Sequence, residues 1–306
     1  EFEVSVVDSL AVNNYLSLKK QKIQNKKFYL KTLNQRQDLL KKNNINLIIE
    51  DARDYALVTR IIEKFKPNYL IHLAAVAHAN VSNKDPYSTF DHSMRTLENT
   101  LDACRSQKFI DRFIYLSSSM VYGQFKKKIV TEKEICNPLG IYAALKFGSE
   151  KLVEGYNQVF DLPYTIIRPS ALYGQRCVSG RVVQKFIEAA LKGKKLEVVG
   201  DGKETLDFTY IDDFMQGVFL TMTNKNSLNE TFNITYGKSR SLVELINIIK
   251  DNITKVKIKY IKRDKLMPFR GTLSVNKAKS LLGYNPAHSL EKAVPKYIKW
   301  YVDSKF

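Results

Sequence analysis

The sequence predicts an α/β protein built on a doubly wound parallel sheet. Two observations predict this class: short, nearly uniformly apolar runs recur through the first half of the chain, and longer helical patterns separate them. Runs rich in β-branched and aromatic residues, without polar alternation, are typical of strands buried on both faces. Their alternation with helices is the pattern of a parallel sheet with helices on both sides.

The expected elements follow in order along the chain. Expected strands lie at 4–7, 47–49, 69–73, 113–116 and 164–167, and expected helices at 53–65, 86–106 and 140–160. The helix at 86–106 follows Asp85-Pro86, a cap residue with proline at the first helical position. Residues 1–167 are therefore expected to form a Rossmann-type domain.

After Arg168-Pro169 the pattern loosens. We expect residues 168–306 to form a smaller mixed α/β part that binds substrate, with some segments returning to the first domain. Its expected helices lie at 181–192, 241–252, 276–282 and 289–304.

The start of the chain departs from the doubly wound pattern. Such a fold begins with a strand, a glycine-rich turn and a helix, and its first strand lies in the middle of the sheet. This chain begins at a strand that ends in Asp8, and it contains no glycine-rich nucleotide-binding motif. We therefore expect that roughly 25 residues of native chain precede Glu1 and supply the first strand and turn.

Composition limits the classes of function. The chain is 44% hydrophobic, which is enough for a core, and it has no apolar run of the roughly 18 residues that a membrane span needs. The first ten residues carry three acids and no base, unlike a signal peptide. Three widely separated cysteines without metal-ligand spacing favour a reduced, cytoplasmic protein without a metal: Cys104, Cys136 and Cys177.

The formal net charge of +18 permits nucleic-acid binding or an anionic small substrate. The lysines are scattered, and no basic strand is interleaved with aromatic residues. We therefore expect a small anionic substrate and no nucleic acid.

Tyr142 and Lys146 are the candidate chemical groups. At a spacing of i and i+4 they share one face of a helix, and a serine-rich strand end, Ser117–Ser119, precedes them. A lysine ammonium at ~4 Å would favour a tyrosine phenolate by about 4 kcal/mol. Such a site can move a proton and a hydride on a secondary alcohol. The same spacing recurs at three other tyrosines, so only the preceding strand distinguishes Tyr142.

Asp8 closes an apolar strand. A carboxylate in this position can accept both hydroxyls of an adenosine ribose, which favours NAD over its 2′-phosphorylated form. An ordinary turn aspartate is the alternative.

These landmarks, in this order, give a resemblance that covers the chain from Val4 to about Trp300. The sequence resembles the extended short-chain dehydrogenase/reductase family, and within it the NAD-dependent sugar-nucleotide epimerases and dehydratases. The segments that carry the resemblance are Val6–Asp8, Glu50–Asp54, His72–Ala75, Asp85–Pro86, Ser117–Gly123, Tyr142–Lys146, Arg168–Gly174, Gly200–Gly202, Asp207–Asp213, Arg270–Gly271 and Leu282–Pro286.

The resemblance implies roles for individual residues. It implies Ser118, Tyr142 and Lys146 as catalytic, with Ser117 or Ser119 as alternatives one position away. It implies that NAD is held in a domain at 1–167 by Tyr142, Lys146 and a further set: Asp8, Asp51, Ala52, Leu73, Ala74, Ala75 and Ser93. It implies substrate contacts at Ser119, Arg181 and Arg270, although a solvated surface role for Arg181 stays open.

Departures from the family pattern narrow the chemistry. Ser119-Met120 replaces the Asp-Glu pair of the 4,6-dehydratases, which argues against dehydration. Ala171, Leu206 and Ser93 replace residues that usually contact substrate or cofactor, and Arg176 or Arg181 would compensate for Leu206 as a diphosphate ligand.

We therefore expect an NAD-dependent sugar-nucleotide epimerase that acts at C4 through a transient 4-keto sugar. An NAD(P)H-dependent 4-keto-sugar-nucleotide reductase and a non-catalytic NAD-binding protein on the same fold are the alternatives. The expected partners are a nucleotide sugar and a second copy of the chain, which would pair through the helices at 86–106 and 140–160.

Overall fold

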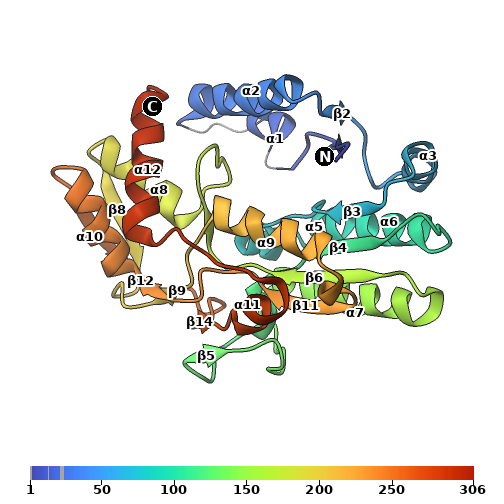
Figure 1. Cartoon of the computed structure of the whole chain (residues 1–306). Helices are drawn as coiled ribbons and strands as arrows, with labels where there is room; N and C mark the ends of the chain where they lie inside the picture. The colour runs from blue at the N-terminus through green and yellow to red at the C-terminus, as the bar shows by residue number, and fades with distance from the viewer. Residues whose placement is uncertain (1, 13, 21–23) are drawn as a thin grey trace.

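A computed structural model of the chain describes residues 2–12, 14–20 and 24–306. Its main sheet has four parallel strands (Figure 1), in the order β11 (Glu230–Asn233), β6 (Tyr164–Arg168), β4 (Arg112–Leu116) and β3 (Tyr69–His72). The predicted α/β class with a parallel sheet is confirmed.

Helices cover both faces of this sheet. On one face, Phe113 and Tyr115 of β4 pack with α3 (Tyr55–Phe65), α6 (Thr96–Cys104) and α7 (Gly140–Phe160). On the other, Ile114 and Leu116 pack with α9 (Ile211–Thr223) and α11 (Asn276–Leu282). Because both faces are covered, β4 is buried along its whole length, as its uniformly apolar sequence predicts.

A second parallel pair, β1 (Ser5–Val7) and β2 (Asn46–Ile48), lies beside the main sheet. Within the described residues, β1 pairs only with β2 and β3 pairs only with β4, so no ladder joins β1 to β3. The strand expected before Glu1 would lie between them. Val7 and Ile71 are 42% and 37% exposed on these two strands. The expectation concerns chain outside this sequence and stays a prediction.

Several helix bounds agree with the sequence. Helices α7 and α11 begin and end where expected, at 140–160 and 276–282. The helix expected at 86–106 is observed as a continuous helical run from Pro86 to Cys104, in which a π-helical turn, η1 (Asp91–Arg95), joins α5 (Pro86–Phe90) to α6. Asp85 caps α5 as predicted, since its carboxylate accepts the Ser88 amide at 3.0 Å.

The remaining helices and strands build the C-terminal part and the connections. A core of α8 (Val182–Leu191), α10 (Leu242–Asn252) and α12 (Leu290–Asp303) packs beside the parallel pair β8 (Lys195–Val199) and β13 (Lys257–Ile261). The short elements are α4 (Ala79–Lys84), η2 (Ser119–Tyr122), β5 (Ile129–Val130), β7 (Leu172–Tyr173), β9 (Thr205–Leu206), β10 (Thr209–Tyr210), η3 (Lys225–Ser227), β12 (Arg240–Ser241) and β14 (Thr272–Leu273).

Two helices near the N-terminus, α1 (Tyr15–Lys20) and α2 (Lys26–Lys42), were not predicted. Helix α2 packs on the C-terminal part, where Phe28 stacks on Tyr301 at 5.6 Å between ring centroids. The buried carboxylate of Glu188, on α8, accepts hydrogen bonds from Asn25 at 2.9 Å and Tyr29 at 2.5 Å. The first and last segments of the chain are therefore joined directly (Figure 1).

No described helix is both long and apolar enough to cross a membrane.

Candidate active site

The serine-rich segment after β4 is held by an extension of the parallel ladder. The Ser117 amide donates to the Ile167 carbonyl at 2.8 Å, and the Ser119 amide donates to the Pro169 carbonyl at 2.9 Å. The Ser118 hydroxyl accepts the Met120 amide at 3.2 Å, which starts the turn η2. Ser118 and Ser119 are buried, and Ser119 is only 1% exposed.

Helix α7 places Lys146 against the end of β4. The helix begins at Gly140, whose φ of +80° favours glycine. The Lys146 ammonium donates to the Leu116 carbonyl at 2.5 Å and lies 4.8 Å from the centre of the Tyr115 ring. Burial lowers the pKa of Lys146 to about 8, and the nearby Glu150 opposes this change.

His72, at the end of β3, faces the same buried region. Its ring stacks between Phe113 and Tyr115, and its Nε2 has no hydrogen-bond partner among the described residues. Burial, and then the charge of Lys146, lower the pKa of His72 to about 3. His72 is therefore neutral at physiological pH.

Tyr142 lies one helical turn before Lys146 and is half-buried. Its phenol lies within electrostatic range of Arg270. Burial is the largest cause that lowers the pKa of Arg270 to about 10. Arg181 and Arg263 lower it further, while Tyr142 acts in the opposite direction. The structure thus places Tyr142 within electrostatic range of a cationic group from the far end of the chain.

Arg270 lies within electrostatic range of Arg181 and Arg263, and Arg263 is itself paired with Glu204. These three arginines are called the cationic cluster. Arg181 directly precedes α8, and its guanidinium donates to the carbonyl of Ala77, beyond β3. Arg270 is anchored through its carbonyl, which accepts the Thr205 hydroxyl at 2.8 Å. The Nε of Arg270 is buried without a partner among the described residues. The structure therefore places Arg181, which is half-buried, within electrostatic range of Arg270.

Arg263 and Arg270 line a pocket of about 390 Å³. The guanidinium of Arg263 lies 3.6 Å from the centre of the Phe269 ring. Phe269 lines the pocket too, and the other lining residues are Gly200, Asp201, Lys203, Glu204 and Thr205.

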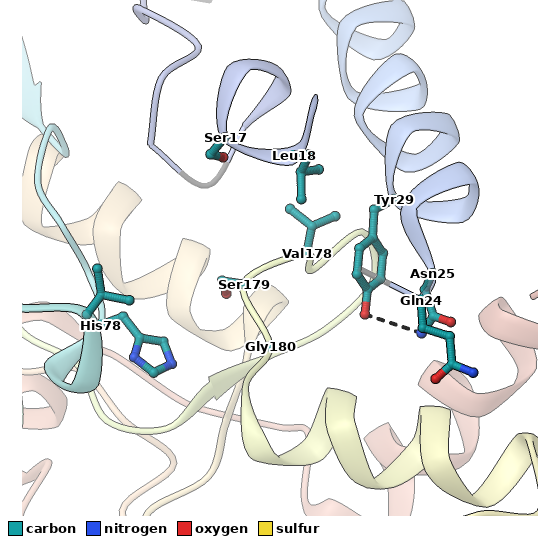
Figure 2. Close-up of a pocket in the computed structure, with 10 residues that line it drawn as sticks. Ser17, Leu18, Gln24, Asn25, Tyr29, His78, Val178, Ser179 and Gly180 are labelled. Carbon is teal, nitrogen blue, oxygen red and sulfur yellow. Dashed lines mark hydrogen bonds between the residues drawn. The ribbon is translucent and has the colours of Figure 1, made fainter. Parts of the chain in front are cut away.

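A second pocket, of about 400 Å³, lies between α1, α2 and the loop before α8 (Figure 2). His78 and Ser179 line it, and Nδ1 of His78 is buried without a partner in the described structure. Burial and then Arg181 lower the pKa of His78. Sequence reasoning missed both residues because no motif contains them, and only the fold brings residue 179 beside residue 78.

Two of the residues predicted to hold the adenosine end of NAD, Asp8 and Asp51, already accept hydrogen bonds from other residues of the protein. Asp8 lies at the carboxyl end of β1, where its carboxylate accepts the Leu10 amide at 2.7 Å and the Asn14 side chain at 3.3 Å. The Asp51 carboxylate is held by Arg53, with 2.7 Å between Nη2 and Oδ2, and this hydrogen bond lowers the pKa of Asp51. In this structure, then, the carboxylate of Asp51 is already engaged.

The remaining predicted cofactor residues follow β3 or adjoin it. Leu73 and Ala74 are exposed at its carboxyl end, Ala75 is half-buried, and the Ala74 carbonyl accepts the Thr96 hydroxyl at 3.2 Å. The Ser93 hydroxyl accepts the Val76 amide at 3.2 Å from the π-helical turn. The Ala52 carbonyl accepts a hydrogen bond from the Asn99 side chain at 3.0 Å, so this carbonyl of the predicted cofactor contact already has a partner.

The polar groups at the strand ends fit the two riboses of a dinucleotide. A carboxylate closes β1, and the Lys146 ammonium has three donors, of which one is used by Leu116. The pyrophosphate between them would need a glycine-rich turn. The first glycine of the sequence is Gly123.

A parallel α/β sheet with a tyrosine–lysine helix beside a serine-bearing strand end defines the extended short-chain dehydrogenase/reductase class. The chain belongs to the NAD dependent epimerase/dehydratase family, whose family model matches residues 10–235.

Relatives and solved structures agree on this family. The chain is 32% identical over 236 residues to an uncharacterized UDP-glucose epimerase, YtcB, of Bacillus subtilis, covering 76% of this chain and 73% of the relative. It is 31% identical over 217 residues to a dTDP-D-glucose 4,6-dehydratase of Dictyostelium discoideum, covering 67% and 50%. The crystal structure of UDP-glucuronic acid 4-epimerase from Bacillus cereus, in complex with UDP-glucuronic acid and NAD, superposes with a TM-score of 0.87 at 26% identity, covering 98% and 91%.

Proposed function

We propose that this protein is an NAD-dependent epimerase that inverts C4 of a nucleotide sugar. The observation that carries the proposal is the position of Lys146. Its ammonium is fixed at the end of β4, directly before the serine-rich segment, and Tyr142 lies one helical turn away on the same helix.

Tyr142 is the proposed acid and base. It takes the proton of the sugar 4-hydroxyl as C4 is oxidised, and it returns that proton after the 4-keto sugar has turned its other face to the site. Ser118 hydrogen-bonds the sugar 4-hydroxyl and orients it toward Tyr142. NAD, when bound, supplies the acceptor and then the donor of the hydride. Lys146 would hold the nicotinamide ribose and Asp8 the adenosine ribose.

The cationic cluster is the proposed site of the diphosphate. Arg181 lies within electrostatic range of Arg270, and guanidinium groups bind phosphate oxygens in a bidentate manner. Relatives carry the names UDP-glucose epimerase and UDP-glucuronate 4-epimerase, and the Bacillus cereus epimerase was crystallised with UDP-glucuronic acid. We therefore propose these two compounds as the first substrates to test.

We further propose that the protein does not catalyse 4,6-dehydration, although dehydratases occur among its relatives. Dehydration needs an acid and a base beyond the catalytic hydroxyl. Ser119 and Met120 follow Ser118, and neither side chain exchanges protons readily at neutral pH.

The test is an incubation of the protein with NAD and UDP-glucose or UDP-glucuronic acid, followed by NMR of the sugar. Formation of the C4 epimer without a net change in absorbance at the NADH wavelength supports the proposal. Net consumption of NADH with a 4-keto substrate would instead identify a reductase. Failure to bind NAD(H) in a fluorescence titration would favour a non-catalytic protein.

We also propose a homodimer that forms through α5, α6 and α7, by analogy with the family. Sedimentation equilibrium should give twice the chain mass of 35.2 kDa. A monomer at micromolar concentration would contradict this. The three cysteines are free, which agrees with the proposed cytoplasmic location.

A further inference from the structure

Glu150 lies on α7 one helical turn after Lys146, and it is fully buried. Its Oε2 lies 2.6 Å from the Nη2 of Arg168, on β6. Its Oε1 accepts the Nε–H of Arg168 at 3.0 Å and also the hydroxyl of Ser117. The Glu150 carboxylate therefore contacts both Arg168 on β6 and Ser117, the residue before Ser118.

This arrangement gives Lys146 a buried counter-charge. A buried ammonium is costly unless an opposite charge lies near it. Glu150 favours the protonated form of Lys146, and Arg168 holds the Glu150 carboxylate in place through two hydrogen bonds. Without Glu150, the Arg168 guanidinium would lose its carboxylate partner and Lys146 would lose the charge that favours its protonated form.

Other ionisable groups around Lys146 do not replace Glu150. His72 of β3 is neutral, because its pKa is lowered to about 3. Tyr115 of β4 and Tyr122 of η2 are neutral as well, since burial raises the pKa of each phenol. Burial likewise raises the pKa of Cys136, in the loop before α7. In the described structure, the negative charge that acts on Lys146 is that of Glu150, whereas the carboxylate of Glu132 acts on Tyr122.

We propose that Glu150 is a positioning residue which, anchored by Arg168, keeps Lys146 protonated and holds the serine segment at the end of β4. Its catalytic consequence rests on the proposed function, because Lys146 then serves cofactor and substrate. The carboxylate itself need not touch either of them.

The test measures the ionisation of Lys146 directly, in protein without added cofactor or substrate. Lysine labelled with ¹³C at Cε is followed by NMR as the pH is raised, and Lys146→Arg identifies the resonance. Glu150→Gln should lower the titration midpoint of Lys146 by on the order of one pH unit or more. Glu154→Gln is the matched control: this glutamate lies on the same helix but pairs with Lys151 at the surface, so the midpoint should not move.

A second variant protects the test against misfolding. Glu150→Gln combined with Arg168→Met removes both buried charges, a replacement that folds often tolerate. The Lys146 midpoint should again fall, by less than in the single variant. An unchanged midpoint in either folded variant would overturn the proposal.

Activity supplies an independent readout. In Glu150→Gln, the loss of kcat at high pH should move to lower pH by the same interval as the Lys146 midpoint. If Glu150 had a purely structural role, Glu150→Gln would reduce stability but the loss of kcat at high pH would occur at the wild-type pH. That result would count against the proposal. If the wild-type protein shows no NAD-dependent turnover, the proposed function fails, while the NMR titration still decides the role of Glu150.

Discussion

The Lys146 ammonium donates a hydrogen bond to the main-chain carbonyl of Leu116, with 2.5 Å between Nζ and O. This contact ties α7 to the end of β4 and sets the distance between the tyrosine–lysine helix and the serine segment. It also takes a charged group out of water, and the pKa of Lys146 falls to about 8 as a result. The burial that fixes Lys146 at the proposed active site therefore lowers the free energy of unfolding while the lysine is charged.

The stability of Lys146→Met relative to wild type should depend on pH, because only the wild type carries this buried ammonium. In the folded wild type, Lys146 loses its proton above about pH 8, whereas in the unfolded chain it keeps the proton up to about 10.5. The unfolded state then binds more protons, so wild-type stability rises with pH across this window. The stability of Lys146→Met relative to wild type should fall by about 3 kcal/mol between pH 7 and 10.5.

Urea unfolding at several pH values measures this change. Lys151→Met, at an exposed position on the same helix, is the control and should keep a constant difference from wild type. A constant difference for Lys146→Met would show that the lysine is not buried as a cation.

Tyr142→Phe should abolish turnover and spare cofactor affinity. The substitution removes the only atom that exchanges the sugar proton and leaves the ring in place, so a loss of roughly 10²–10⁴-fold in kcat is expected. NADH fluorescence titration should give a dissociation constant within about threefold of wild type. Wild-type turnover in this variant would remove Tyr142 from the mechanism.

Arg270→Gln should weaken nucleotide-sugar binding by roughly 10–100-fold, because a charge-assisted bond to phosphate contributes about 1.5–3 kcal/mol. Binding is measured by calorimetry with UDP. Arg240→Gln is the control, since Arg240 pairs with Glu244 and Glu291 outside the cationic cluster. Equal UDP affinity in the two variants would place the diphosphate elsewhere.

Glu188→Gln should loosen the joint between α2 and the C-terminal part. The carboxylate accepts hydrogen bonds from Asn25, Tyr29, Gln184 and Tyr301, and an amide cannot accept all four through its single oxygen. We expect a loss of about 2–3 kcal/mol in the free energy of unfolding. Glu197→Gln, at an exposed side chain of β8, should stay within about 0.5 kcal/mol of wild type. A similarly small effect at Glu188 would contradict the account.

The sequence predicted the elements whose signal is local. The bounds predicted for helix α7, 140–160, agree with the structure, although three of its five buried residues are polar: Lys146, Ser149 and Glu150. Helix α2, in which only Thr32 and Leu33 of 17 residues are buried, was not predicted. Its packing depends instead on Glu188, more than 150 positions away.

The same distinction applies to the candidate site. The spacing of Tyr142 and Lys146 is a local pattern, whereas the approach of Arg181 to Arg270 and the position of His78 follow from the fold alone. Glu150 is an intermediate case. Its spacing of four from Lys146 was present in the sequence, but only burial and the contact with Arg168 give that spacing a meaning.

The central claim is that one hydride leaves C4 and returns to it within a single site. The most direct measurement uses UDP-glucose or UDP-glucuronic acid carrying deuterium at C4, incubated with the protein and NAD. We predict a C4 epimer that retains the deuterium at C4, with no net NADH formed. Loss of the deuterium to solvent, a 4-keto-6-deoxy product, or unchanged sugar with NAD demonstrably bound would contradict the account.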